Sequence, residues 1–110
     1  MSDTAVETAN KMKTIMRWLY DEQLLSADLI EAKAKTTMEY KRQRAIFATK
    51  AKASGMQVTL IKHHAEGEVA QYEYDMIVAT EALKAHWIKM ENLKAQLNAY
   101  QSINRYLAVS

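Results

Sequence analysis

Basic and aromatic residues are concentrated in one stretch of this chain, between Ala32 and Ser54. Seven basic residues stand there against one acidic residue, Glu39, which gives a net charge of +6. Phosphate groups bind cations, and unstacked bases bind flat apolar rings such as those of Tyr40 and Phe47. The composition predicts a surface for single-stranded nucleic acid, and its basic members are Lys33, Lys35, Lys41, Arg42, Arg44, Lys50 and Lys52.

The spacing of these cations leaves two interpretations open. On an ideal helix, one group of four falls within an arc of roughly 100°, with the two rings at its border. This group is Lys33, Lys41, Arg44 and Lys52, and the other three cations point elsewhere. The alternative is therefore a solvated helix face without a ligand, in which Tyr40 and Phe47 belong to the core.

No arrangement of residues predicts catalysis or a metal site. His63 and His64 are adjacent, so on a helix they point about 100° apart and cannot share an ion, and His63 with Glu66 lacks further ligands. The chain has no cysteine and no glycine-rich phosphate loop. We expect a protein that is not an enzyme and needs no metal and no cofactor. His86 is expected to be a core polar residue with a local hydrogen bond.

The composition also narrows the class of protein. A length of 110 residues predicts one domain, and the absence of cysteine excludes disulfides. The beginning of the chain lacks the pattern of a signal peptide, and no run approaches the ~18 apolar residues of a membrane span. We expect a soluble, cytoplasmic protein.

Two glycines and the absence of proline determine the expected elements. One long helix is predicted over about residues 4–53, beginning with a capping box from Thr4 to Glu7 and ended by Gly55. A second long helix is predicted over about 68–108. The connector, residues 54–67, is expected to contain a short helix capped by Thr59 and ended by Gly67, with an extended segment from Val58 to Ile61 as the alternative.

The second long helix carries a heptad pattern that holds from Val69 to Leu107. Sustained spacing of this kind predicts coiled-coil-like packing against the first helix, a second copy of the chain, or both. One set of positions is Val69, Met76, Leu83, Met90, Leu97 and Asn104, and the other is Tyr72, Ala79, His86, Leu93, Tyr100 and Leu107.

These elements predict an all-α fold, a long antiparallel helical hairpin with a short helical connector. Two paired helices leave apolar surface uncovered, so a homo-oligomer is expected. The heptad seam and the apolar region that includes Trp18, Leu25 and Ile30 are the expected contacts.

The order of these features resembles the UvsY-like recombination mediators of T-even-type phages. The resemblance covers roughly residues 15–107. The matching elements of the first half are Arg17-Trp18-Leu19 and the basic run from Glu39 to Ala45, which continues to Ser54-Gly55. The apolar connector Val58-Thr59-Leu60-Ile61 follows, before Glu66-Gly67-Glu68-Val69. The last matching element is the segment from Asn98 to Arg105. This chain is shorter, and its basic residues are not arranged identically.

The resemblance implies a ring-like oligomer that binds single-stranded DNA through Lys41, Arg42 and Arg44. It further implies partners, a recombinase and a single-strand DNA-binding protein, in a phage-infected bacterial cell. Our main hypothesis is a non-enzymatic accessory protein of DNA recombination or replication. The alternative is a small phage-encoded interaction module, an inhibitor or scaffold that acts through a helical face.

Overall fold

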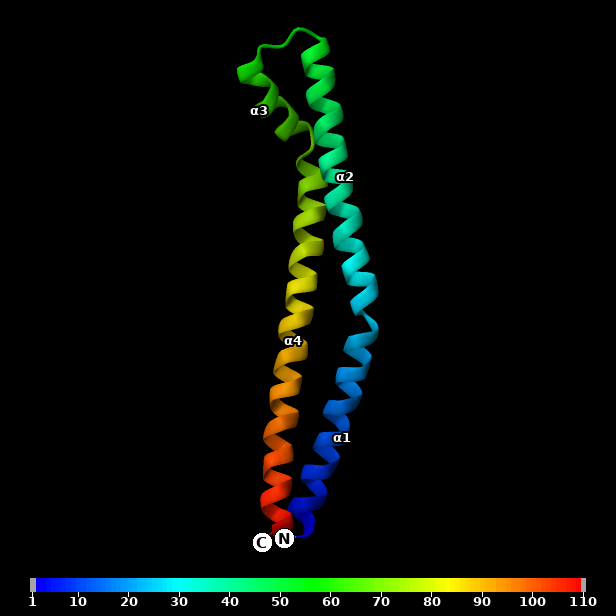
Figure 1. Ribbon diagram of the computed structural model, residues 1–110, viewed down its shortest axis with the longest axis vertical. Helices are drawn as coiled ribbons and strands as arrows, with labels where there is room; N and C mark the ends of the chain where they lie inside the picture. Colours follow the sequence, from blue (N-terminus) through cyan, green and yellow to red (C-terminus); the bar gives the residue numbers. More distant parts are fainter. Residues whose placement is uncertain (1, 110) are drawn as a thin grey trace. The chain divides into compact units, whose positions relative to one another are not determined.

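The computed structural model describes residues 2–109, and over this range it contains four α-helices and no strand. The helices are α1 (Ser2–Leu24), α2 (Ser26–Ala53), α3 (Val58–Glu68) and α4 (Ala70–Val109), and Figure 1 shows them in chain order. The all-α class predicted from the sequence is confirmed. Within residues 2–109, no helix has both the length and the apolar character needed to cross a membrane.

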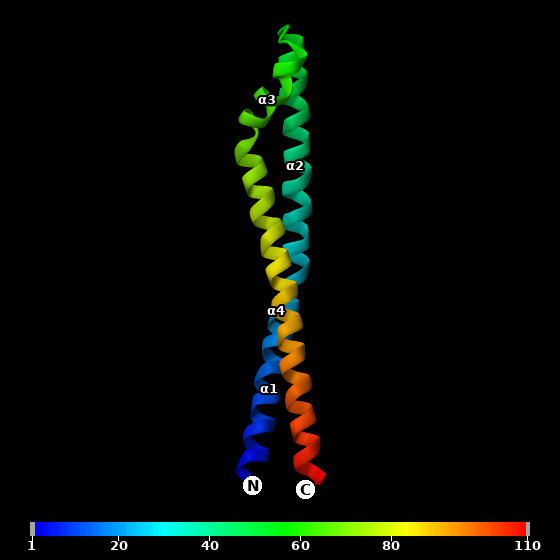
Figure 2. The ribbon, with the colours of Figure 1, turned by 90° about the vertical axis from the view of Figure 1, so that its left-hand side faces the viewer.

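The helices form two compact units. Unit 1 contains the chain up to Ala27 together with the part from Lys84 onward, and unit 2 is Asp28–Leu83. In unit 1, α1 lies beside the second part of α4 and runs antiparallel to it; in unit 2, α2 and the first part of α4 do the same (Figures 1 and 2). The antiparallel pairing expected of a hairpin is therefore present in each unit.

The first long helix, expected over about 4–53, is interrupted. At Leu25 the α-helical pattern gives way to a turn, and the Leu25 N–H donates to the Glu22 carbonyl at 3.0 Å. No glycine or proline marks this position, so the break has no local signal in the sequence. The predicted start is also wrong, because α1 begins at Ser2 and Thr4 lies inside it, where its carbonyl accepts from Thr8 Oγ1 at 2.8 Å.

Gly55 ends α2 as predicted. Its φ is +84°, the left-handed conformation that glycine adopts at little cost. The Met56 N–H donates to the Ala51 carbonyl and the Gly55 N–H to the Lys52 carbonyl, both at 3.1 Å. This pair of bonds is a Schellman motif, which satisfies carbonyls that the end of a helix leaves free.

The connector is helical, and the extended alternative is wrong. However, α3 begins before Thr59, at Val58, and its N-cap is Gln57, whose side chain makes no capping hydrogen bond. Gly67 does not end α3 either, because the helix continues through it to Glu68 and is capped by Val69. Val69, which lies between α3 and α4, is completely buried. The chain therefore passes from α3 to α4 at a packed side chain and not at a glycine.

Burial along α4 follows the heptad. All twelve predicted positions, from Val69 to Leu107, are buried or half-buried, whereas most of the other described α4 side chains are exposed. The first helical arm covers this seam within each unit, through α2 in unit 2 and α1 in unit 1. The seam therefore packs against helices of the same chain.

Candidate nucleic-acid interface

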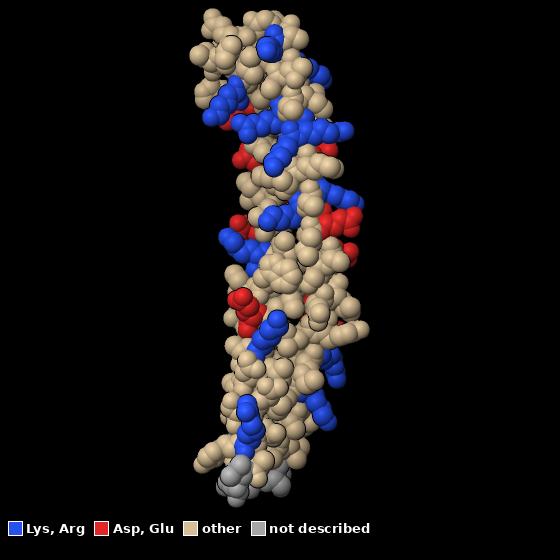
Figure 3. Space-filling model, viewed as in Figure 1, with Lys and Arg blue, Asp and Glu red and all other residues tan. Residues whose placement is uncertain are grey.

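The basic stretch, residues 32–54, lies almost entirely on α2 of unit 2. Helix α2 continues without a break from Ser26 to Ala53, so the helical spacing assumed from the sequence applies to all seven cations. Six of them are exposed and Arg44 is half-buried. Figure 3 shows Lys and Arg side chains gathered over α2 and α3 on the face turned to the viewer.

Three of the seven cations have carboxylate partners. Lys35 pairs with Glu31 one turn before it at 2.9 Å, and Arg42 pairs with Glu39 at 3.5 Å. Arg44 approaches Glu66 of α3 at 3.9 Å, so it helps to hold the connector against α2. Arg44, which both the basic pattern and the resemblance placed at a ligand, is therefore partly engaged within the unit.

The remaining cations are Lys33, Lys41, Lys50 and Lys52. Among the described side chains, no carboxylate lies within 4.0 Å of these four. Lys50 lies over the Phe47 ring, 5.6 Å from its centroid. A cation that has no fixed carboxylate can contact a phosphate, and displace the counterions of a nucleic acid, without first breaking an ion pair, so these four are the strongest candidates for phosphate contacts in the stretch.

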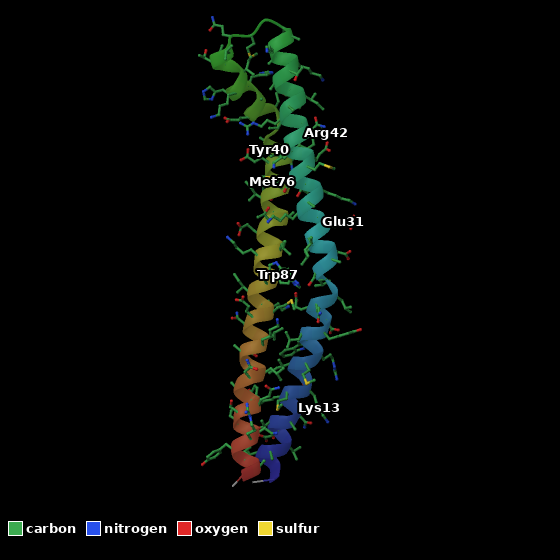
Figure 4. All side chains as sticks on the ribbon, viewed as in Figure 1. Lys13, Glu31, Tyr40, Arg42, Met76 and Trp87 are labelled. Carbon is green, nitrogen blue, oxygen red and sulfur yellow. The ribbon has the colours of Figure 1, made fainter. Side chains whose placement is uncertain are left out.

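The two aromatic residues of the stretch are less available than its cations. Tyr40 and Phe47 are both half-buried. Figure 4 shows Tyr40 on the side of α2 that faces α4, near the level of Met76, and Arg42 on the outer side of α2. Packing within unit 2 thus uses much of each ring, as the alternative interpretation anticipated, and leaves charge as the main property of this surface.

A second polar site lies in unit 1, and sequence reasoning missed most of it. This polar cluster consists of Glu22, Ser26, His86 and Lys89. His86 Nδ1 is 2.6 Å from Glu22 Oε2, and His86 Nε2 is 2.8 Å from Ser26 Oγ. Lys89 Nζ contacts the other carboxylate oxygen, Glu22 Oε1, at 2.7 Å. The hydrogen bonds of His86 are therefore not local, as expected, but reach residues 60 and 64 positions away.

The ionisation state of Glu22 determines which atoms donate in these hydrogen bonds. The hydrogen bond from Lys89, and next that from His86, lowers the pKa of Glu22 below its ordinary value of 4.5, so the carboxylate is ionised at neutral pH. An ionised carboxylate only accepts, so His86 Nδ1–H donates to it, and in the neutral ring Nε2 accepts from the Ser26 hydroxyl. The cluster ties α1 and the first residue of α2 to α4.

The order of hydroxyl, imidazole and carboxylate is also that of Ser-His-Asp hydrolases. Such a site must admit a substrate to the hydroxyl and the imidazole together, but Ser26 is half-buried and the His86 side chain is only 2% exposed. The hollow beside the cluster is lined by Trp18, Asp21, Glu22, Leu25, Lys89 and Leu93, and by neither Ser26 nor His86. The geometry therefore favours a structural role. The only sequence signal for it was a histidine at an apolar heptad position.

Metal ligands are not gathered in the described part of the chain. Over these residues no group of three or more His, Asp or Glu side chains could hold a metal ion. His63 and His64 are exposed on α3, and Glu66 faces Arg44.

Comparison of the chain with protein-family models, with curated proteins and with solved structures found no match.

Proposed function

We propose that this protein is a non-enzymatic accessory protein of DNA recombination or replication that binds single-stranded DNA through α2. The observation that supports this most is the set of four exposed lysines, Lys33, Lys41, Lys50 and Lys52, that have no carboxylate partner among the described side chains. Lys33 and Lys52 are 19 residues apart, or about 28 Å along the helix axis. That length matches a run of several nucleotides.

The half-buried rings determine the kind of binding that we expect. Because Tyr40 and Phe47 offer little free surface, phosphate contacts dominate and binding depends little on base sequence. Recombinase loading, with a recombinase and a single-strand DNA-binding protein as partners, is the more specific role suggested by the resemblance. Self-association is also part of this proposal.

Fluorescence anisotropy with a labelled single-stranded oligonucleotide tests DNA binding. The variant Lys41→Ala/Lys50→Ala/Lys52→Ala should bind at least about tenfold more weakly at low salt, because it removes three phosphate contacts. The slope of log affinity against log salt should fall by about 2, since each contact to a single strand contributes about 0.7.

The matched control changes the same number of exposed cations in unit 1, as Lys13→Ala/Arg17→Ala/Lys94→Ala. This variant has the same net charge, so a general charge effect would weaken both proteins equally. Equal weakening, or no binding by the wild type at low salt, would contradict the proposal. An unlabelled duplex added as competitor shows whether single strands are preferred.

The second candidate is a protein-interaction module, and it is supported by the amount of exposed apolar surface. Trp18, Tyr20, Leu24 and Met38 are each at least half exposed, as are several other large apolar side chains. Recovery of a specific protein partner after nuclease treatment, by a protein that shows no affinity for single-stranded DNA, would favour this candidate.

A further inference from the structure

An apolar groove with two lysines at its edges runs along α2 in unit 2. Ile30, Ala34 and Met38 form its floor at spacings of four residues, and Leu83 of α4 forms one side. Lys33, Thr37 and Lys41 complete the lining, and the hollow has a volume of about 620 Å³. Ile30 and Met38 are 49% and 62% exposed, so about half of each side chain or more is uncovered.

The same unit carries a surface of the opposite charge on α4. Residues 66–83, the acidic segment, contain five acidic residues and no lysine or arginine. Within it, Tyr74, Ile77 and Val78 form an apolar stripe, with exposures of 62%, 48% and 49%. On a helical wheel this stripe lies opposite the heptad seam, and Glu73 and Asp75 fall on its two sides.

We infer that the groove on α2 binds the stripe of a second copy of this chain. An apolar row edged by cations is complementary in charge to an apolar row edged by carboxylates, and contact between the two rows would bury apolar surface on both. Lys33 and Lys41 have no carboxylate partner among the described side chains, and the acidic segment would supply such partners between copies.

The exposed apolar residues of both surfaces support a second copy as the occupant. Ile30 and Met38 of the groove, and Tyr74, Ile77 and Val78 of the stripe, are each about half exposed or more, so both rows have apolar surface left to bury. This inference rests on the self-association included in the proposed function. Because Lys33 and Lys41 belong to both proposed surfaces, assembly is tested without DNA.

The contact joins two different surfaces, so it is heterologous. Each copy accepts a neighbour in its groove and offers its own stripe to the next copy, and the assembly therefore grows beyond two chains. This property makes a charge-reversal experiment decisive. A groove variant, Lys33→Glu/Lys41→Glu, has two acidic surfaces, and a stripe variant, Glu73→Lys/Asp75→Lys, has two basic surfaces.

The experiment measures mass in solution by light scattering on the full chain, without DNA. Each charge-reversal variant alone should associate at least about tenfold more weakly than the wild type, because like charges face each other. An equimolar mixture should restore assembly, because every contact then joins opposite charges. A wild type that stays monomeric at high concentration, or a mixture that fails to assemble, overturns the inference.

Two single substitutions locate the contact. Ile77→Glu places a charge in the stripe and should weaken assembly, whereas Ile103→Glu changes a residue of similar exposure, 44%, in unit 1 and should not. The reverse result would assign assembly to another surface. Circular dichroism of each variant shows that it is folded, and anisotropy with DNA reports separately on the nucleic-acid proposal.

Discussion

Units 1 and 2 continue the same heptad seam but bury different kinds of residue in it. Unit 1 buries Ile15, Met90 and Leu93 together with His86, which is hydrogen-bonded to the carboxylate of Glu22. The buried apolar residues of unit 2 are Ala51, Ala65, Val69 and Leu83. One periodic pattern therefore supports two kinds of packing, one that includes a polar network and one in which every buried residue is apolar.

The two units also differ in how their charged residues are arranged. Unit 1 has seven basic and five acidic residues spread along its helices, whereas unit 2 has eight of each, segregated by sign. Seven of its eight basic residues lie in the basic stretch on α2, and five of its acids lie in the acidic segment. Both units contain ion pairs, but unit 2 concentrates most of its basic residues on one segment and most of its acidic residues on another, whereas unit 1 does not.

The largest effect on stability should come from unit 1. His86→Ala removes the centre of the polar cluster and leaves Glu22 Oε2 and Ser26 Oγ without their partner, so it should cost about 3 kcal/mol of unfolding free energy. Chemical denaturation measures this loss. His63→Ala, at an exposed position of α3, is the control and should change stability by less than about 0.5 kcal/mol.

Replacing the whole cluster separates its two possible contributions. The triple variant Glu22→Leu/Ser26→Ala/His86→Leu leaves no buried group without a partner, because Lys89 is exposed to water, and it should lose less stability than His86→Ala alone. If the triple variant is the less stable of the two, the cluster contributes net stabilisation beyond the satisfaction of its own groups.

A smaller effect is the pH dependence of the same cluster. The pKa of Glu22 is lower in the folded chain than its ordinary value of 4.5, so its contribution to stability is complete above that value. The contribution is lost as the pH falls through the folded-state pKa. The stability difference between wild type and Glu22→Gln should therefore be constant near neutrality and shrink below about pH 4.5. A difference that grows on acidification would contradict this assignment.

The smallest effects concern the backbone of unit 2, where two glycines differ. Gly67 lies inside α3 with nothing within 4 Å of an added Cβ, so Gly67→Ala should stabilise the protein by about 0.5–1 kcal/mol. Gly55 has φ +84°, so Gly55→Ala should destabilise it by about 1 kcal/mol despite equally open space. Thermal unfolding of the two variants measures both changes in stability. Equal effects would mean that Gly55 does not need its left-handed conformation.

The sequence predicted the features that depend on periodicity and on glycine at a helix end. The seam from Val69 to Leu107 and the end of α2 at Gly55 follow from such local rules, whereas the connector is helical as predicted but has neither of its predicted ends. The break at Leu25 does not follow from them, because it involves no helix-breaking residue. It lies beside the polar cluster, in which His86 joins residues 60 and 64 positions away, and a contact of that kind has no local signature.

The basic composition of the candidate interface was predictable from the sequence, but the carboxylate neighbours of its cations were not. The pattern placed seven cations on one helix, and the structure distinguishes Lys41 from Arg44 by the presence of Glu66 beside the latter. The half-burial of Tyr40 and Phe47 depends on how α2 packs in unit 2, so helical spacing alone could not decide between a stacking surface and a core.

Both tryptophans of the chain, Trp18 and Trp87, belong to unit 1, and unit 2 contains none. Selectively excited tryptophan fluorescence therefore reports on unit 1 alone, while far-ultraviolet circular dichroism averages over the helices of both units. Agreement of the two melting curves would show that the units unfold as one cooperative system, and separate curves would assign each transition to its unit. The chain thus carries a built-in optical probe that needs no label.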